Sequence, residues 1–117
     1  MKGSSFLDVT SQASVEKMGS NSHGGQQTDQ YRITNSGQSV VDTHLLIIVR
    51  GLPYEAVLEN ASGRTHSGDP YIRVFLPNGV LQPGQNIVQT LIFSREGGNK
   101  APPLSYVLDL LSGQGNP

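Results

Sequence analysis

Apolar and polar residues alternate with a period of two along most of this chain, the pattern of strands with one buried face. The segments that show it are 7–16, 28–35, 40–50, 56–60, 71–76, 87–94 and 104–111. Stretches rich in Gly, Pro, Asn and Ser separate these segments, as expected where strands end in turns. The pattern therefore predicts an all-β chain with about seven strands and no helix.

The strongest predicted strand is Val40–Arg50. Both of its faces are partly apolar, which predicts a central strand covered on two sides at one end. Apolar positions also recur there at helical spacing, but the β-branched residues and the flanking glycines favour a strand. In segment 87–94, the polar Gln89 lies on the same predicted face as the apolar Ile87, Leu91 and Phe93. Its presence leaves the register of segment 87–94 open.

The connecting segments are predicted as loops or tight turns from their Gly, Pro and Asn content. We expect mobile or polar loops at 19–27 and 62–69, and turns at 35–38, 77–79 and 82–85. Two packed sheets would bury the apolar faces of about seven strands in roughly this length of chain. The predicted fold is therefore an antiparallel β-sandwich at 8–111, with an N-terminal tail or linker at 1–7 and a C-terminal linker at 112–117.

Composition agrees with this fold and excludes several classes of protein. The 117 residues are 35% hydrophobic and 15% charged, with 14 glycines and 7 prolines, which suits short strands joined by many turns. The absence of cysteine excludes a disulfide scaffold, a zinc ribbon and a thiol nucleophile. A net charge of -1 provides no broad attraction to nucleic acid, and the longest apolar run, Leu45–Val49, is too short to span a bilayer. We expect no nucleic-acid partner and no membrane insertion.

No arrangement of residues predicts a catalytic or metal site. The nine acidic residues are spaced singly, without the context of a glycosidase pair. His23, His44 and His66 lie on separate predicted elements and have no metal-binding spacing. The sequence predicts a protein that is not an enzyme and carries no metal or cofactor.

Several short motifs follow one another in an order that is more specific than any one of them. Asn35-Ser36-Gly37 is followed by an apolar strand, Gly51-Leu52-Pro53 and the run Val57–Gly63; Pro70-Tyr71-Ile72, Leu81–Gln85 and Leu91–Ser94 come later. The order resembles the immunoglobulin-like or fibronectin-III-like accessory modules of large secreted bacterial multidomain proteins. That resemblance implies the sandwich fold, an extracellular or cell-surface location within a longer exported chain, and neighbouring domains of the same polypeptide as partners. It implies no reaction.

The best ligand platform in the sequence is the stripe Tyr71, Arg73 and Phe75, opposite the face that carries Ile72 and Val74. Aromatic faces can stack on sugar rings, and Arg73 can donate hydrogen bonds to hydroxyls. Tyr54 and His66 border loops and are further candidates. The alternative is that this face packs on a neighbouring domain.

Three functional hypotheses follow. The first is a non-catalytic accessory module that spaces, stabilises or attaches domains. The second is a carbohydrate-binding module appended to a polysaccharide-active enzyme, with polysaccharide as its partner. The third is a protein-interaction module that uses an exposed sheet edge for strand addition.

Overall fold

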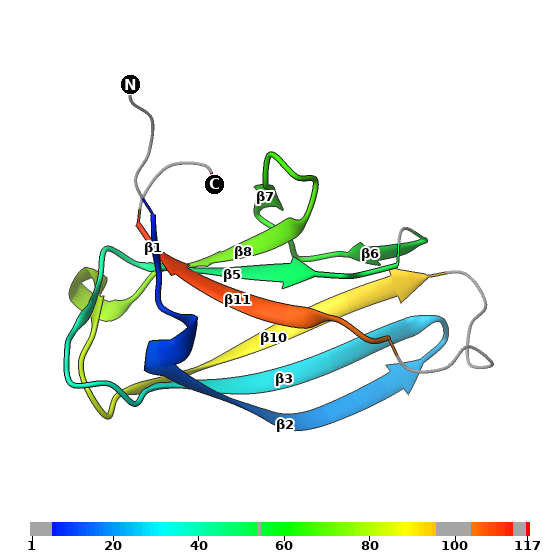
Figure 1. The fold of residues 1–117 in the computed structure, drawn as a ribbon. Coiled ribbons are helices and arrows are strands. Elements are labelled where there is room, and N and C mark those ends of the chain that lie inside the picture. The colour runs from blue at the N-terminus through cyan, green and yellow to red at the C-terminus, as the bar shows by residue number, and fades with distance from the viewer. Residues whose placement is uncertain (1–5, 54, 96–103, 114–116) are drawn as a thin grey trace.

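A computed structural model describes residues 6–53, 55–95, 104–113 and 117. These residues form eleven strands and two short 3₁₀ helices, η1 (Thr10–Gln12) and η2 (Pro77–Gly79) (Figure 1). Sheet A has the order β1 (Leu7–Asp8), β11 (Val107–Ser112), β5 (Leu45–Arg50), β8 (Pro70–Val74), β7 (Gly63–Arg64). Sheet B has the order β2 (Ala13–His23), β3 (Gln26–Asn35), β10 (Asn86–Arg95), β6 (Ala56–Leu58), and the small sheet C pairs β4 (Val41–Asp42) with β9 (Val80–Leu81). Every pairing is antiparallel. The prediction of an all-β chain is confirmed, and the number of strands exceeds the predicted seven.

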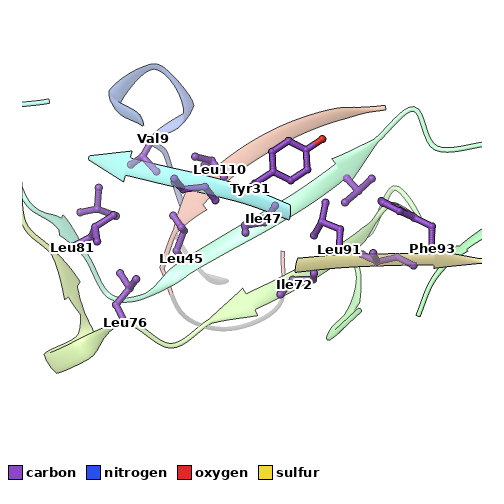
Figure 2. Packing of buried hydrophobic residues seen from close by; sticks show 14 of the residues in the cluster. Val9, Tyr31, Leu45, Ile47, Ile72, Leu76, Leu81, Leu91, Phe93 and Leu110 are labelled. Carbon is purple, nitrogen blue, oxygen red and sulfur yellow. The ribbon is translucent and has the colours of Figure 1, made fainter. Parts of the chain in front are cut away.

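One hydrophobic core draws on all three sheets (Figure 2). Ile47 and Leu110 come from sheet A, Ile33 and Phe93 from sheet B, and Leu81 from sheet C, and all five are at most 2% exposed. The alternating apolar residues of three predicted strands contribute to this core: Tyr31 and Ile33 in 28–35, Ile72, Val74 and Leu76 in 71–76, and Leu104, Tyr106, Leu108 and Leu110 in 104–111.

Strand β5 lies in the middle of sheet A and is buried on both faces. Leu45, Ile47 and Val49 belong to the main core. Leu46 and Ile48 instead form a second cluster with Tyr71, against which Phe6 and Leu111 pack. The prediction of a central strand covered on two sides is therefore confirmed for Leu45–Val49.

The prediction of one continuous strand from Val40 to Arg50 is wrong. Thr43 and His44 adopt left-handed backbone conformations, with φ of 66° and 61°, and they separate β4 from β5. The His44 N–H donates to the Gly79 carbonyl at 3.0 Å, and its Nδ1 accepts from the Leu76 N–H at 2.9 Å. These contacts hold the break in place, and they depend on a segment more than thirty residues away in the chain.

The loop predicted at 19–27 is also wrong, because this stretch forms a long hairpin. β2 continues to His23, and β3 begins at Gln26. Gly24 and Gly25 have φ of 60° and 84°, as a tight two-residue hairpin turn requires. An exposed edge strand needs no alternation of apolar and polar residues, so the polar composition of this stretch gave no signal for a strand.

Other connections differ less from expectation. The loop predicted at 62–69 contains the two-residue strand β7. The turn at 82–85 is confirmed by the bond from the Gln85 N–H to the Gln82 carbonyl at 2.9 Å. β10 pairs with β3 without interruption, and Gln89 lies opposite Tyr31, so this residue causes no shift in register.

Candidate functional site

Tyr71 and Arg73 lie on β8, and Phe75 comes directly after its last residue, Val74. Tyr71 pairs with Ile48 and Arg73 with Leu46, so the first two lie on the face of sheet A that points away from the main core. The Tyr71 ring is buried at 4% exposure, whereas Phe75 is 73% exposed. The stripe thus does not present two aromatic rings side by side to solvent.

Phe75 lies instead against His44. The two rings meet edge to face, with centroids 5.2 Å apart and planes at 72°. His44 is held by its hydrogen bonds to Leu76 and Gly79, so Phe75 lies beside the residues that separate β4 from β5. Only one aromatic face of the predicted stripe is open to a ligand.

Tyr71 and His66 come together at a second place, a surface hollow beside β7. The hollow has a volume of about 410 Å³ and is lined by Ser62, Gly63, Arg64, Thr65, His66, Tyr71 and Pro117. Arg73 and Phe75 are not among these lining residues, and Tyr54 lies outside the described residues.

The loop that follows β7 closes on itself and shapes the hollow. The Thr65 N–H donates to the Asp69 carbonyl at 2.8 Å, and Arg64 Nη1 donates to the Gly68 carbonyl at 2.8 Å. A Cβ at Gly63 would lie 2.9 Å from the Tyr71 hydroxyl oxygen, so only glycine permits this close approach. The hollow presents hydroxyl, imidazole and guanidinium groups, which suit hydrogen bonding to a polar ligand rather than stacking.

Sequence reasoning missed a polar cluster beneath sheet B, centred on Asp29. The side chain of Asp29 is fully buried and accepts hydrogen bonds from Ser20 Oγ at 2.5 Å, Gln27 Nε2 at 2.9 Å and the Tyr106 hydroxyl. Lys17 Nζ lies 3.6 Å from Asp29 Oδ2. We call these four residues, with Asp29 and Tyr31, the Asp29 cluster.

The cluster joins β2 and β3 to the segment before β11. Because the Tyr106 proton is directed to Asp29, the 2.7 Å bond between the two tyrosine hydroxyls must be donated by Tyr31. Gln27 Oε1 accepts from the Leu104 N–H at 3.1 Å. Asp29 accepts hydrogen bonds from β2, from β3 and from the segment before β11, so this carboxylate ties three parts of the chain together and is a structural anchor.

The cluster shifts the pKa of its members. Burial acts to raise the pKa of Asp29, but hydrogen bonds from Ser20, Tyr106 and Gln27 and the charge of Lys17 outweigh it and hold the pKa below the usual value. Burial and the bond to Asp29 raise the pKa of Tyr106 far above its ordinary range. The sequence does contain a signal for the cluster. Side chains two positions apart on a strand share a face, so Asp29 and Gln27 lie on the same inward face as Tyr31 and Ile33.

A second group of charges lies at the surface of sheet A. Arg50 Nη1 lies 2.9 Å from Asp69 Oδ2, and its Nε donates to Asp109. We call these three residues the Arg50 group. Their side chains are between 27% and 41% exposed, so water shares in their solvation.

The described residues contain no group of three or more His, Cys, Asp or Glu side chains placed to hold a metal ion. In the same part of the chain, no helix has the length and apolar character needed to cross a membrane. No protein-family model matches this chain, and a search of curated proteins finds no significant relative. The antiparallel all-β architecture is compatible with an immunoglobulin-like or fibronectin-III-like fold.

Proposed function

We propose that this chain is an immunoglobulin-like or fibronectin-III-like β-sandwich that serves as a non-catalytic accessory module of a larger secreted or cell-surface bacterial protein. In this role it spaces, stabilises or attaches the neighbouring domains of the same polypeptide. The family resemblance of its ordered motifs is the basis of the bacterial and extracellular part of the proposal.

The observation that carries the proposal is the closure of the fold on itself. The main core includes Val9 from the first part of the chain and Leu110 from the last strand, and the Val9 N–H donates to the Leu110 carbonyl at 2.9 Å. Leu7 pairs with Ser112, so the chain enters the domain beside the point where it leaves. A unit whose two ends complete one core is suited to be carried as a self-contained module.

The test uses both the domain and the protein that carries it. The purified domain is expected to unfold in urea as one cooperative unit and to turn over no substrate. Deleting residues 6–113 from the full-length protein is expected to preserve the reactions of its other domains while reducing its stability or its retention at the cell surface. A reaction catalysed by the isolated domain would overturn the proposal, as would finding the full-length protein only in the cytoplasmic fraction.

A second candidate function, polysaccharide binding, is favoured by the hollow that brings Tyr71 and His66 together with three other polar side chains. Since the Tyr71 ring is buried, recognition there would rest on hydrogen bonds to sugar hydroxyls. Affinity electrophoresis against a panel of soluble polysaccharides would detect it.

Three variants distinguish the possible locations of such binding. His66→Ala removes the imidazole, and Tyr71→Phe removes the hydroxyl while keeping the buried ring. Phe75→Ala changes only the exposed ring outside the hollow. Saturable retardation lost in the first two variants and kept in the third would support the hollow. The opposite pattern would move the site to Phe75, and no retardation with any polysaccharide would count against the function.

A further inference from the structure

The sheet edges of this domain are protected to very different degrees. Sheet A ends in β1 and β7, each only two residues long. At the β6 end of sheet B, the side chain of Asn60 continues the ladder: its Nδ2 donates to the Thr90 carbonyl at 2.8 Å, and its Oδ1 accepts from the Ile92 N–H at 3.1 Å. Short strands and side chains that occupy backbone groups are common ways to prevent unwanted strand pairing.

The opposite edge of sheet B is long and open. Within the described residues β2 pairs only with β3, and every residue from Ser14 to His23 is exposed. Figure 1 shows β2 at the outside of the sheet with no labelled strand beyond it. A bulge between Lys17 and Gly19 interrupts the strand, which leaves Ala13–Lys17 as a regular segment.

The two charged side chains of this segment, Glu16 and Lys17, contact residues of the neighbouring strand β3. Lys17 reaches Asp29 and lies 5.7 Å and 5.9 Å from the ring centroids of Tyr31 and Tyr106. Glu16 pairs with Arg32 at 3.4 Å. β2 contains no proline. The bulge lies after Lys17, so neither proline nor a bulge, two of the features that protect edge strands, interrupts Ala13–Lys17.

The hydrogen bonds of β3 show which peptide groups face the open edge. The Asn35 N–H donates to the Gln85 carbonyl, and the Asn35 carbonyl accepts from the Gly84 N–H. The N–H and carbonyl groups of the odd-numbered residues of β3 therefore point toward β10. The even-numbered peptides then point toward β2. Since Val15 pairs with Ile33, the peptide groups of Val15 and Lys17 are directed to the outer edge. The carbonyl of Ala13 shares that direction, while its N–H already donates to Thr10.

This edge is complementary to itself. In an antiparallel pair related by a two-fold axis at Val15, the two Val15 residues exchange N–H and carbonyl bonds, and each Lys17 N–H meets the partner's Ala13 carbonyl. Ser14 then lies opposite Glu16, and no like charges face each other. From these observations we propose that β2 is a homodimerisation edge, through which a second copy of this chain extends sheet B across the two molecules.

The first test is sedimentation equilibrium of the full chain, from low micromolar to the highest soluble concentration. A reversible monomer–dimer equilibrium is expected. Val15→Lys places two like charges opposite each other across the axis and is expected to weaken association by roughly tenfold or more. Val88→Lys is the matched control, because Val88 is also exposed on sheet B but lies on β10. Circular dichroism establishes that both variants are folded.

The second test locates the contact directly. The chain has no cysteine, so Val15→Cys gives a single reporter whose partner in the dimer is its own copy. Opposed residues in such a pair are about 5.5 Å apart between Cα atoms, within the reach of a disulfide. Rapid disulfide formation in Val15→Cys, and not in Val88→Cys, would support the proposal. A chain that stays monomeric at every concentration would overturn it, and so would a dimer that Val15→Lys leaves unchanged.

Discussion

The Asp29 cluster and the Arg50 group contain the same kinds of interaction in two different environments. Asp29 is fully buried and receives hydrogen bonds from three side chains on three segments of the chain. The Arg50 group holds a comparable ion pair, but the Arg50 side chain is 41% exposed. Loss of Asp29 would leave the buried Gln27 amide without a bond that water can readily replace, whereas water replaces the bonds lost at the surface. The comparison teaches that burial, more than the number of bonds, decides how much a polar group matters to this fold.

The largest effect is expected from Asp29→Ala. It leaves the buried Gln27 amide and the half-buried Tyr106 hydroxyl without their common acceptor, at a cost of about 3 kcal/mol in the free energy of unfolding, whereas the exposed Ser20 hydroxyl can bond to water. Urea unfolding followed by circular dichroism measures the loss. A variant as stable as the parent would show that water or a rearranged side chain satisfies these donors.

A smaller effect of the same origin is expected in acid. The pKa of Asp29 is lowered in the folded state, so its stabilising contribution is present above the unfolded value of about 4 and is lost as the pH falls through the lower folded value. Unfolding midpoints at about pH 7 and about pH 3 measure this loss. Asp29→Asn cannot titrate and is expected to flatten the dependence. Part of the slope should remain, because a hydrogen bond from the Thr10 backbone also lowers the pKa of Asp8. An unchanged slope in Asp29→Asn would contradict the assignment.

Tyr106→Phe sharpens the comparison within the buried cluster. It keeps the ring that packs against Phe93 at a centroid distance of 4.9 Å and removes only the hydroxyl between Tyr31 and Asp29. The expected loss is about 1.5 kcal/mol, the contribution of one hydrogen bond to a charged group. Tyr31→Phe removes the outer hydroxyl alone and is expected to cost less, so the reverse order in the two unfolding midpoints would contradict the proposed direction of donation.

The smallest effect is expected from Asp109→Ala in the Arg50 group. Arg50 keeps Asp69 as a partner, and an exposed ion pair is worth about 0.2–1 kcal/mol. This loss should shrink further when the salt concentration is raised, whereas the loss in Asp29→Ala should change little. If Asp109→Ala destabilised the domain as much as Asp29→Ala, the distinction drawn from burial would be wrong.

The positions of most strands could be predicted from sequence because alternation of apolar and polar residues reports directly on a half-buried strand. Segments 28–35, 71–76 and 104–111 all place their alternating apolar residues in the core. Strands and interruptions that lack this signal could not be predicted. The part of β2 from Gly19 to His23 is exposed and was predicted as a loop, and the interruption at Thr43 and His44 lies inside an apolar run.

The candidate sites were less predictable than the fold, because they depend on which segments meet. Alternation correctly placed Tyr71 and Arg73 on the same face of β8, but it did not predict the depth at which each lies. The burial of Tyr71 follows from Leu46 and Ile48 on the neighbouring strand. The approach of His66 to Tyr71 follows from the loop after β7.

By itself, the sequence determined the all-β class of this protein, the inward faces of its apolar strands and its ordinary turns, since these depend on local periodicity and backbone preference. The tertiary structure alone decided the order of strands in each sheet, the left-handed break held by Gly79 and Leu76, and the partners of Asp29. It also decided which edge is covered and which is open. These features depend on contacts between residues that are distant in the chain, and the residue pattern of one segment does not determine which other segment it will pack against.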